Sequence, residues 1–168
     1  LQNFLTIKSL TMTVKAILAC DSDWGIGKDG GLPWPHNPAD LKWFKQSTLN
    51  HTVVMGKATW DSLPVKPLPN RVNVVVSSSD ILAKVDVLSI SDLRRRLSSM
   101  DTDQDVWIIG GARLIEGMMD YIDEFHLSQI NGTYNCDTFL PSTLIQELYA
   151  LTSSQFMGDV YVDIWSKR

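Results

Sequence analysis

The segment VVMGKATWDSL, residues 53–63, contains the pattern that decides the fold class. An unbroken apolar run rich in valine ends at Gly56, and a helical pattern begins near Lys57 to Thr59. Strands that are covered on both faces have such unalternating runs, because neither face meets water. We therefore predict a buried strand that turns directly into a helix.

Similar units recur along the chain. The predicted strands are Val14–Ala19, Val53–Met55, Val72–Val76, Val85–Leu88 and Val106–Ile109, and helical patterns lie between them near 38–48, 58–63, 91–98 and 112–119. Alternation of strands and helices predicts an α/β fold with a parallel sheet and right-handed crossovers. Two later runs, Phe125–Ile130 and Val160–Trp165, look like strands joined by a long irregular stretch without a strong helix. The second alternates better, which predicts antiparallel pairing as a hairpin or an edge strand.

The composition is typical of one globular domain. The chain has 168 residues, of which 44% are hydrophobic and 20% charged, and its net charge is −4. A nucleic-acid or membrane-surface partner would favour clustered positive charge, so this balance argues against both. The basic run Arg94-Arg95-Arg96 is typical of a solvated helix face, with an anion site as the alternative. No apolar run approaches the length that a membrane-spanning helix needs.

The cysteines and histidines do not indicate a metal site. Cys20 and Cys136 lack CxxC spacing and histidine partners, and His36, His51 and His126 show no ligand spacing. We therefore expect reduced thiols, no bound metal and a cytoplasmic protein.

The first eleven residues differ from the rest of the chain. They lack the basic start and the long apolar core of a secretory signal. We expect residues 1–11 to be a leader or a non-native remnant. The native start would then be Met12, and the domain would span residues 12–168.

Three glycine-containing segments are candidates for phosphate binding. Gly25, Gly27 and Gly30 match the G-x-G-x-x-G spacing, but prolines follow where a helix would have to begin, so we interpret them as a mobile loop. The turns at Gly56 and at Gly110-Gly111 lead into helical patterns instead, and a helix N-terminus favours an anion. At these two turns an ordinary strand–helix connection is the alternative interpretation.

Hydroxyl side chains add a further candidate site after the strand Val72–Val76. Ser77, Ser78 and Ser79 follow it, and the carboxyl ends of parallel strands are where open α/β sheets bind ligands. Three strand ends with phosphate-type donors predict a dinucleotide laid across the sheet. Lys57, Ser78 and Arg113 would supply charge and donors for a 2′-phosphate, which favours NADPH over NADH.

The segment GGLPWPHNPADLKWFK, residues 30–45, contains a predicted helix start. Asn37 is a suitable N-cap and Pro38 a suitable first helical residue. Asp40 then falls in the first turn, where an acid also interacts favourably with the helix dipole. Helix capping is therefore one explanation of this acid.

The helical periodicity gives a second explanation of Asp40. At about 100° per residue, Asp40 shares one face with Trp43, Phe44 and Leu41, while the opposite face carries Lys42, Lys45 and Gln46. A carboxylate on an apolar face is costly unless a ligand pairs with it. We therefore interpret Asp40 as a group that binds a nitrogen heterocycle through its N–H donors and assists protonation during hydride transfer.

Five ordered motifs resemble those of dihydrofolate reductases. They are LPW…PADLKWFK, VVMGKATWDSL, LPNRVNVVVSSS, IIGGARLIE and CDTFLP, and the similarity covers nearly everything after Met12. The resemblance implies a single-domain α/β fold with an eight-stranded, mostly parallel sheet, an antiparallel C-terminal strand and flanking helices. It also implies NADPH-dependent reduction of 7,8-dihydrofolate to 5,6,7,8-tetrahydrofolate by a cytoplasmic monomer. The glycine-rich segment before Trp34 would be a flexible lid over the nicotinamide, and antifolate inhibitors would be further ligands.

The resemblance assigns residues to three groups by position. Asp40 matches the active-site acid, Trp34 matches the loop tryptophan that organises water, and Ser128 stands where a threonine usually joins the hydrogen-bond network of the acid. The implied substrate-binding residues are Ile17, Ala19, Asp40, Leu41, Phe44, Leu63, Leu68, Arg71 and Ile109, with Arg71 on the glutamate α-carboxylate. The implied cofactor-binding residues are Ala19, Ile26, Gly27, Gly56, Lys57, Ala58, Thr59, Ser77, Ser78, Ile109, Gly110, Gly111, Ala112, Arg113 and Leu114.

Three departures from the family pattern leave its chemistry intact. Ile115 stands where an aromatic residue is common, Asn70 replaces a usual glycine, and Pro35-His36-Asn37 lengthens the loop by one residue relative to some members. Two other functions stay open: an NADPH-dependent pyrimidine reductase of riboflavin synthesis, and a noncatalytic protein that keeps the fold. The PADLKWFK helix argues against the first, and the combination of Asp40, Arg71 and Gly110-Gly111 argues against the second.

Overall fold

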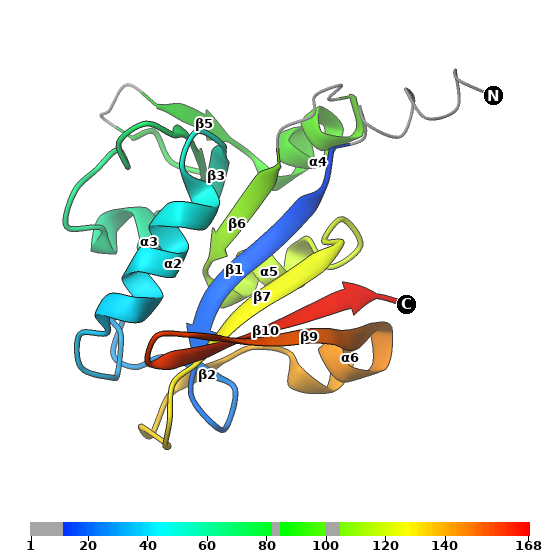
Figure 1. Cartoon of the computed structure of the whole chain (residues 1–168). Helices are drawn as coiled ribbons and strands as arrows, with labels where there is room; N and C mark the ends of the chain where they lie inside the picture. The colour runs from blue at the N-terminus through cyan, green and yellow to red at the C-terminus, as the bar shows by residue number, and fades with distance from the viewer. Residues whose placement is uncertain (1–11, 82–84, 100–104) are drawn as a thin grey trace.

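The structure, a computed structural model, describes residues 12–81, 85–99 and 105–168. The expected leader, residues 1–11, lies outside the described residues. The described chain forms one large sheet flanked by helices, together with a small two-stranded sheet (Figure 1).

The large sheet has eight strands in the order β5-β4-β3-β6-β1-β7-β10-β9. Its strands are β1 Val14–Cys20, β3 Thr52–Gly56, β4 Val72–Val76, β5 Asp86–Leu88, β6 Val106–Gly110, β7 Glu124–Gln129, β9 Tyr149–Met157 and β10 Val160–Lys167. Neighbouring strands from β5 to β7 are parallel, and β10 is antiparallel to both β7 and β9. The predicted eight-stranded, mostly parallel sheet with one antiparallel C-terminal strand is confirmed.

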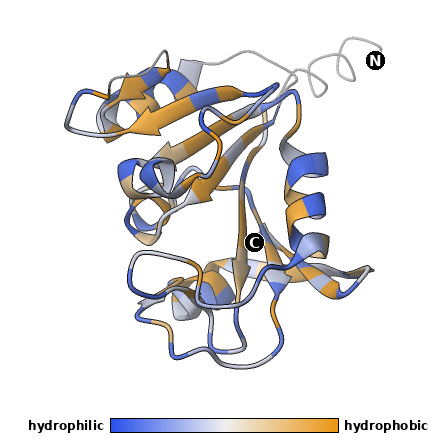
Figure 2. Cartoon of the chain, turned by 90° about the vertical axis from the view of Figure 1, so that its left-hand side faces the viewer, coloured by the Kyte–Doolittle hydropathy of each residue, from blue (hydrophilic) through white to orange (hydrophobic). Residues whose placement is uncertain are grey.

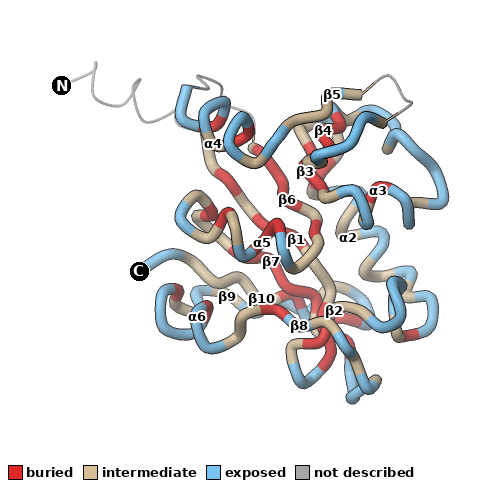
Figure 3. Tube along the Cα trace, turned by 180° about the vertical axis from the view of Figure 1, so that it is seen from behind, coloured by how far each residue is buried: buried red, intermediate tan, exposed pale blue. Residues whose placement is uncertain are grey.

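The helices cover both faces of this sheet. They are α2 Pro38–Thr48, α3 Lys57–Ser62, α4 Ile90–Ser99, α5 Ala112–Gly117 and α6 Ser142–Leu148. Figures 1 and 3 show α2 on one face and α5 on the other. All four helices predicted from the sequence are present, and α5 is shorter than the predicted pattern over 112–119.

The stretch between Ile130 and Val160 corrects one prediction. It was expected to be irregular, yet it contains α6 and the nine-residue strand β9. The strand β9 lies at the edge of the sheet, and most of its side chains are exposed. Its sequence therefore has no unbroken apolar run, and the strand pattern is weak. As a consequence β10 lies inside the sheet, and the hairpin form of the prediction is the correct one.

The core is divided by the sheet into two layers, because alternate residues of a strand face opposite sides. One layer contains Ala16 of β1 and packs against Leu93 of α4 and Leu114 of α5. The other contains Ile17 of β1 and packs against Trp43 and Phe44 of α2. Figures 2 and 3 show that the central strands are the most hydrophobic and most buried part of the chain. The second layer therefore connects α2 with the centre of the sheet.

The predicted mobile loop begins instead with a short strand. Gly25–Gly27 forms β2, which pairs antiparallel with β8, Thr138–Phe139. A Cβ atom at Gly25 would overlap the Cys136 side chain, so close packing excludes a larger residue there. The sequence did not reveal this because the partner strand lies more than a hundred residues away. Gly30 does lie in a turn, where its φ of +79° suits glycine.

Candidate functional site

The N-terminus of α2 is built as the sequence predicts. The Asn37 side chain caps the helix by accepting a 3.0 Å hydrogen bond from the Asp40 backbone N–H, and Pro38 is the first helical residue. Since Asn37 provides the cap, the Asp40 carboxylate is not needed for it. No hydrogen bond in the described part of the chain ties the Asp40 side chain to the helix end. Helix capping therefore does not explain Asp40.

Asp40 lies in a partly desolvated environment next to β7. Burial raises the pKa of the Asp40 carboxyl, and the neighbouring Ser128 hydroxyl partly offsets that rise. Ser128 is completely buried, and its Oγ forms no hydrogen bond of standard geometry with a described residue. We therefore regard the two groups as close neighbours whose hydrogen-bonding capacity is not fully used within the chain.

The two faces of α2 differ as the periodicity predicts. Trp43 and Phe44 are half-buried and pack on the second core layer, whereas Lys42, Lys45 and Gln46 are exposed. Leu41 departs from this pattern, because 45% of its surface is exposed although it lies on the apolar side. An apolar side chain that the fold leaves uncovered next to Asp40 is available to a ligand.

Two further predicted residues lie near Asp40. Ala19 of β1 is the register partner of Ser128 on β7, so both lie side by side on the sheet. Trp34 is buried in a cluster with Ile130 and Val160, and Ala19 and Ala39, the residue before Asp40, pack against this cluster. The Trp34 ring also meets Tyr134 edge-on, with ring centroids 6.1 Å apart. Asp40 and Ser128 are thus neighbours, and Trp34 lies in the cluster that adjoins Ala39 and Ala19.

Arg71 lies at the opposite end of α2. Its Nη1 donates a 3.1 Å hydrogen bond to the Thr48 Oγ1, and its Nε donates to the Pro69 carbonyl at 2.9 Å. The guanidinium carbon lies 5.9 Å from the Phe44 ring centroid, and burial lowers the Arg71 pKa. Thr48 follows Asp40 by eight positions, which corresponds to roughly 12 Å along a helix. The acid and the arginine are therefore spaced for an elongated ligand with polar groups at both ends.

Two residues that sequence reasoning missed hold this end of the site. Thr48 is the buried last residue of α2 and accepts the Arg71 hydrogen bond. Asn73 on β4 is buried, and its side chain bonds both the N–H and the carbonyl of Leu68. Asn73 thereby fixes the loop that contains Leu68 and Arg71. An asparagine inside the apolar run VNVVV was the available signal, because buried polar groups need partners.

Other predicted substrate-binding residues lie in the same layer. Leu63, Leu68 and Ile109 are partly buried and pack with Phe44 against one apolar cluster. The departure at Asn70 also has a structural basis, because Asn70 adopts a φ of +57°. Asparagine tolerates this left-handed conformation better than most residues, so it can replace glycine here. The departure at Ile115 lies in the other core layer, where that side chain is completely buried.

The predicted phosphate-binding turns lie next to one another at the carboxyl ends of neighbouring parallel strands. Met55 and Gly56 on β3 are register partners of Gly110 on β6 and Val76 on β4. A Cβ atom at Gly110 would lie 3.4 Å from the Thr59 Oγ1, and one at Gly56 would lie 3.8 Å from the Gly111 nitrogen. The ends of β3, β4 and β6 are thus adjacent, as expected for a ligand that crosses parallel strands.

The charged residues at these strand ends are exposed, whereas the hydroxyl residue Ser77 is half-buried. Lys57 forms a 2.7 Å ion pair with Asp61 one turn further along α3, and the Ser77 Oγ accepts from the Ser79 N–H. Ser78 and Arg113 are exposed as well. The predicted donors for a 2′-phosphate therefore lie on three neighbouring connections, and no contact in the described structure joins them directly.

Ile26 and Gly27 lie on β2, whose position depends on Asp21. The Asp21 carboxylate is buried and accepts four hydrogen bonds. Its Oδ1 accepts from the N–H groups of Asp23 at 2.9 Å and Gly25 at 2.8 Å. Its Oδ2 accepts from the Tyr134 N–H at 3.0 Å and from the Cys136 Sγ at 3.3 Å. This single side chain connects the loop before β2 with the segment before β8, and sequence reasoning did not identify it.

Two classes of site are not seen in the residues that the structure describes. Within residues 12–81, 85–99 and 105–168, no three His, Cys, Asp or Glu side chains are grouped to hold a metal ion. None of the described helices has the length and hydropathy needed to cross a membrane. Arg94, Arg95 and Arg96 each have a partner in Gly117, Asp92 or Asp86, which favours the interpretation of a helix face over an anion site.

Comparisons with known proteins identify the family. The family model for dihydrofolate reductase matches residues 13–161. Dihydrofolate reductase of Buchnera aphidicola subsp. Acyrthosiphon pisum is 35% identical over 130 residues, covering 77% of this chain and 80% of that protein. The Staphylococcus aureus enzyme is 41% identical over 133 residues, covering 77% and 79%. Dihydrofolate reductase from Enterococcus faecalis, solved with NADP(H) and RAB-propyl, superposes with a TM-score of 0.82 at 27% identity, covering 95% of this chain and 98% of that one. The chain therefore belongs to the dihydrofolate reductase family.

Proposed function

We propose that this chain reduces 7,8-dihydrofolate to 5,6,7,8-tetrahydrofolate with NADPH, which supplies the hydride. The observation that carries the assignment is the partly desolvated Asp40 carboxyl on an apolar helix face beside Ser128, in a chain of this family. A related pyrimidine reductase and a noncatalytic role have no support in the fold or in the relatives.

Asp40 is the residue to which we assign the polar end of the pterin. A carboxylate there can accept hydrogen bonds from an amino group and an adjacent ring N–H, which would offset the cost of its burial. The raised pKa also brings this group closer to the range in which it can hold or transfer a proton at neutral pH. Trp34 and Ser128 would complete this polar end, and Ile17 and Ala19 would form its floor on β1.

Arg71 is the residue to which we assign the far end of the substrate. Its Nε and Nη1 are already held by Pro69 and Thr48, so the guanidinium is pre-organised at little further entropic cost. A carboxylate is the natural partner of a guanidinium. Leu41, Phe44, Leu63, Leu68 and Ile109 would pack on the apolar part between the two ends.

The residues at the ends of β3, β4 and β6 fit a dinucleotide. Cβ atoms at Gly110 and Gly111 would lie close to the Thr59 hydroxyl, and one at Gly56 would lie close to the Gly111 nitrogen, so these turns consist of closely packed backbone without side chains. We assign this backbone to the phosphate-bearing part of the dinucleotide. Lys57, Ser77, Ser78 and Arg113 would bind the phosphate groups. Ala19, Ile26, Gly27, Ala58, Ile109, Ala112 and Leu114 complete the proposed cofactor site.

Several finer statements stay predictions. Both cysteines are free, as expected for a reducing compartment such as the cytoplasm. The same group of predictions includes the monomeric state, the sensitivity to antifolates and the domain boundary at Met12. It also includes the role of β2 and its turn as a lid over the nicotinamide.

The test compares wild type with Asp40→Asn by following NADPH absorbance with dihydrofolate present. We expect kcat to fall by about 10²–10⁴-fold, the usual contribution of a proton-transfer group. The loss should be smallest at low pH, where the substrate can arrive already protonated. Asp163→Asn is the matched control, because Asp163 bonds Ser154 on the β9–β10 hairpin, outside the proposed site. Absence of turnover in a correctly folded wild type would refute the function, and an unimpaired Asp40→Asn would remove the acid from the site.

A further inference from the structure

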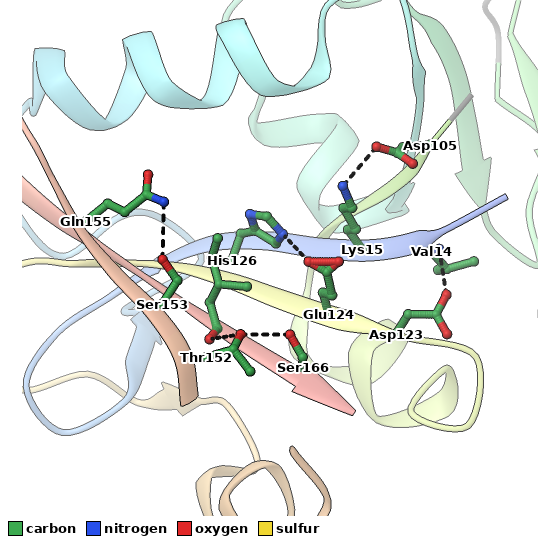
Figure 4. Close-up of polar contacts among 11 residues, drawn as sticks. Val14, Lys15, Asp105, Asp123, Glu124, His126, Thr152, Ser153, Gln155 and Ser166 are labelled. Carbon is green, nitrogen blue, oxygen red and sulfur yellow. Dashed lines mark hydrogen bonds and ion pairs between the residues drawn. The ribbon is translucent and has the colours of Figure 1, made fainter. Parts of the chain in front are cut away.

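His126 is a buried titratable residue that the proposed reaction does not use. It lies on β7, is only 6% exposed, and its Nε2 is 3.2 Å from the Glu124 Oε1. Figure 4 shows this pair beside the 2.9 Å ion pair of Lys15 and Asp105. A histidine in the interior that is paired with a carboxylate needs a physical explanation.

The imidazole supports an aromatic residue of α2. The Trp43 ring lies nearly parallel to the His126 ring, at an interplanar angle of 18° and a centroid distance of 6.3 Å. The Trp107 ring meets the imidazole edge-on at 5.1 Å. Trp43 follows Asp40 by three residues and therefore lies one turn further along the same side of the helix. His126 thus lies beneath this turn of α2, next to the apolar cluster against which Trp43 also packs.

The hydrogen bonding of His126 favours one protonation state. Glu124 is an acceptor when ionised, so the hydrogen of a neutral imidazole belongs on Nε2. The Nδ1 is buried and has no partner among the described residues. Protonation would place a second buried N–H where no acceptor from the described chain is available. Burial lowers the His126 pKa, and the Glu124 charge opposes that shift. The neutral ring is therefore the form that this environment accommodates.

The charges around His126 come from several elements. Glu124 lies on the same strand, Lys15 on β1, and Asp105 just before β6, and these three act on the imidazole. On α2, Lys42 and Lys45 are exposed on the opposite face, and Asp40 lies near Ser128, two residues beyond His126 on β7. The β10 register partner is Ile164, which carries no charge. Glu124 is thus the nearest group that can be changed to alter the charge state of the imidazole.

We propose that His126 is a positioning residue for the acid helix, with Glu124 fixing the neutral imidazole on which Trp43 rests. Protonation of His126 would disturb the Trp43 contact and with it the placement of Asp40, so folate binding should weaken in acid. The turns after β3, β4 and β6, to which we assign the cofactor, do not contact His126 or Glu124. NADPH binding should therefore not change with the protonation of His126. The kinetic part of this inference rests on the proposed function, whereas the contact between His126 and Trp43 does not.

The test uses His126→Phe, Glu124→Gln and the control His36→Phe, in which an exposed histidine is replaced. KM for dihydrofolate and for NADPH is measured from pH 5 to pH 8, and intrinsic tryptophan fluorescence is titrated without substrates. A phenylalanine keeps a flat ring under Trp43, so His126→Phe should stay within about threefold of wild type in dihydrofolate KM at neutral pH. It should lose the part of the acid-side rise in dihydrofolate KM that comes from His126, which begins below the ordinary histidine range because burial lowers the His126 pKa. Only the part that comes from protonation of Asp40 should remain. Because the Glu124 charge raises the His126 pKa, Glu124→Gln should move that rise to lower pH.

The fluorescence titration provides a readout that needs no turnover. An imidazolium quenches a neighbouring indole, so wild type and His36→Phe should show an acid-side decrease that is absent in His126→Phe and shifted to lower pH in Glu124→Gln. The inference is overturned if His126→Phe keeps the wild-type pH dependence of dihydrofolate KM, or if both KM values change together. Should His126→Phe fail to fold, an unshifted fluorescence titration in Glu124→Gln overturns it. If the chain shows no turnover, only the proposed function fails, and the fluorescence comparison still decides the role of His126.

Discussion

The four hydrogen bonds at Asp21 allow a quantitative prediction for Asp21→Asn. The substituted side chain keeps nearly the same volume and one oxygen, which can still accept from the N–H groups of Asp23 and Gly25. Its amide group, however, would face the Tyr134 N–H and the Cys136 thiol, which are both donors. A buried donor left without an acceptor costs about 1–3 kcal/mol, and a thiol is a weak donor, so the free energy of unfolding should fall by roughly 2–4 kcal/mol.

The assay is urea unfolding at pH 7 together with thermal unfolding. For a chain of this size the expected loss corresponds to a decrease in Tm of roughly 4–16 °C. The difference should also depend on pH. Burial opposes ionisation of Asp21, but its hydrogen bonds from Gly25, Tyr134, Cys136 and Asp23 outweigh burial and lower its pKa. A carboxyl whose pKa is lower in the folded than in the unfolded state stabilises the fold at pH values above its unfolded-state pKa. This stabilisation is lost as the pH falls through the folded-state pKa. The wild-type advantage should therefore shrink in acid.

Asp163→Asn is the matched control for Asp21→Asn. Asp163 accepts one described side-chain hydrogen bond, from the Ser154 hydroxyl at 2.6 Å, and an asparagine oxygen can accept it equally well. Its effect should stay within about 0.5 kcal/mol, the usual range for surface substitutions. The reasoning is refuted if Asp21→Asn is no more destabilising than this control, or if its effect is unchanged between pH 7 and the acid range.

Two further predictions concern the proposed substrate site. Arg71→Leu removes the guanidinium held by Pro69 and Thr48, so KM for dihydrofolate should rise at least tenfold while KM for NADPH stays constant. The rise is consistent with the loss of a charge-assisted hydrogen bond, which contributes about 1.5–3 kcal/mol. An unchanged dihydrofolate KM would exclude Arg71 from the site. Leu41→Asn should raise the dihydrofolate KM with little change in Tm, since Leu41 is 45% exposed. Leu151→Asn, at a residue 50% exposed on β9, is its control and should change neither quantity.

The sequence predicts the parts of the fold that depend on local patterns. Apolar runs rich in valine or isoleucine identify β3, β4 and β6, because a strand that is covered on both faces is apolar over most of its length. Asn37 and Pro38 identify the start of α2 for similarly local reasons. The helical periodicity also places Asp40 beside Trp43 and Phe44, which the structure confirms.

The parts that could not be predicted depend on distant partners. The edge strand β9 has mostly exposed side chains, so its sequence lacks the apolar signal of a buried strand. The pairing of Gly25–Gly27 with Thr138–Phe139 and the role of Asp21 both require knowledge of a segment more than a hundred residues away. Leu41 was expected to share the environment of Phe44, yet its exposure depends on what packs over the helix rather than on periodicity.

The central position of β1 has a consequence for folding. This strand lies between β6 and β7, and its register partners include Trp107 and Glu124 for Lys15. The strands that pair with β1 therefore lie about a hundred residues further along the chain. Since loop closure must precede such pairings, long-range contacts of this kind slow folding. Amino-terminal fragments that end before β6 should accordingly leave the first strand unpaired, and ordered β1 should emerge late, together with the middle of the sheet.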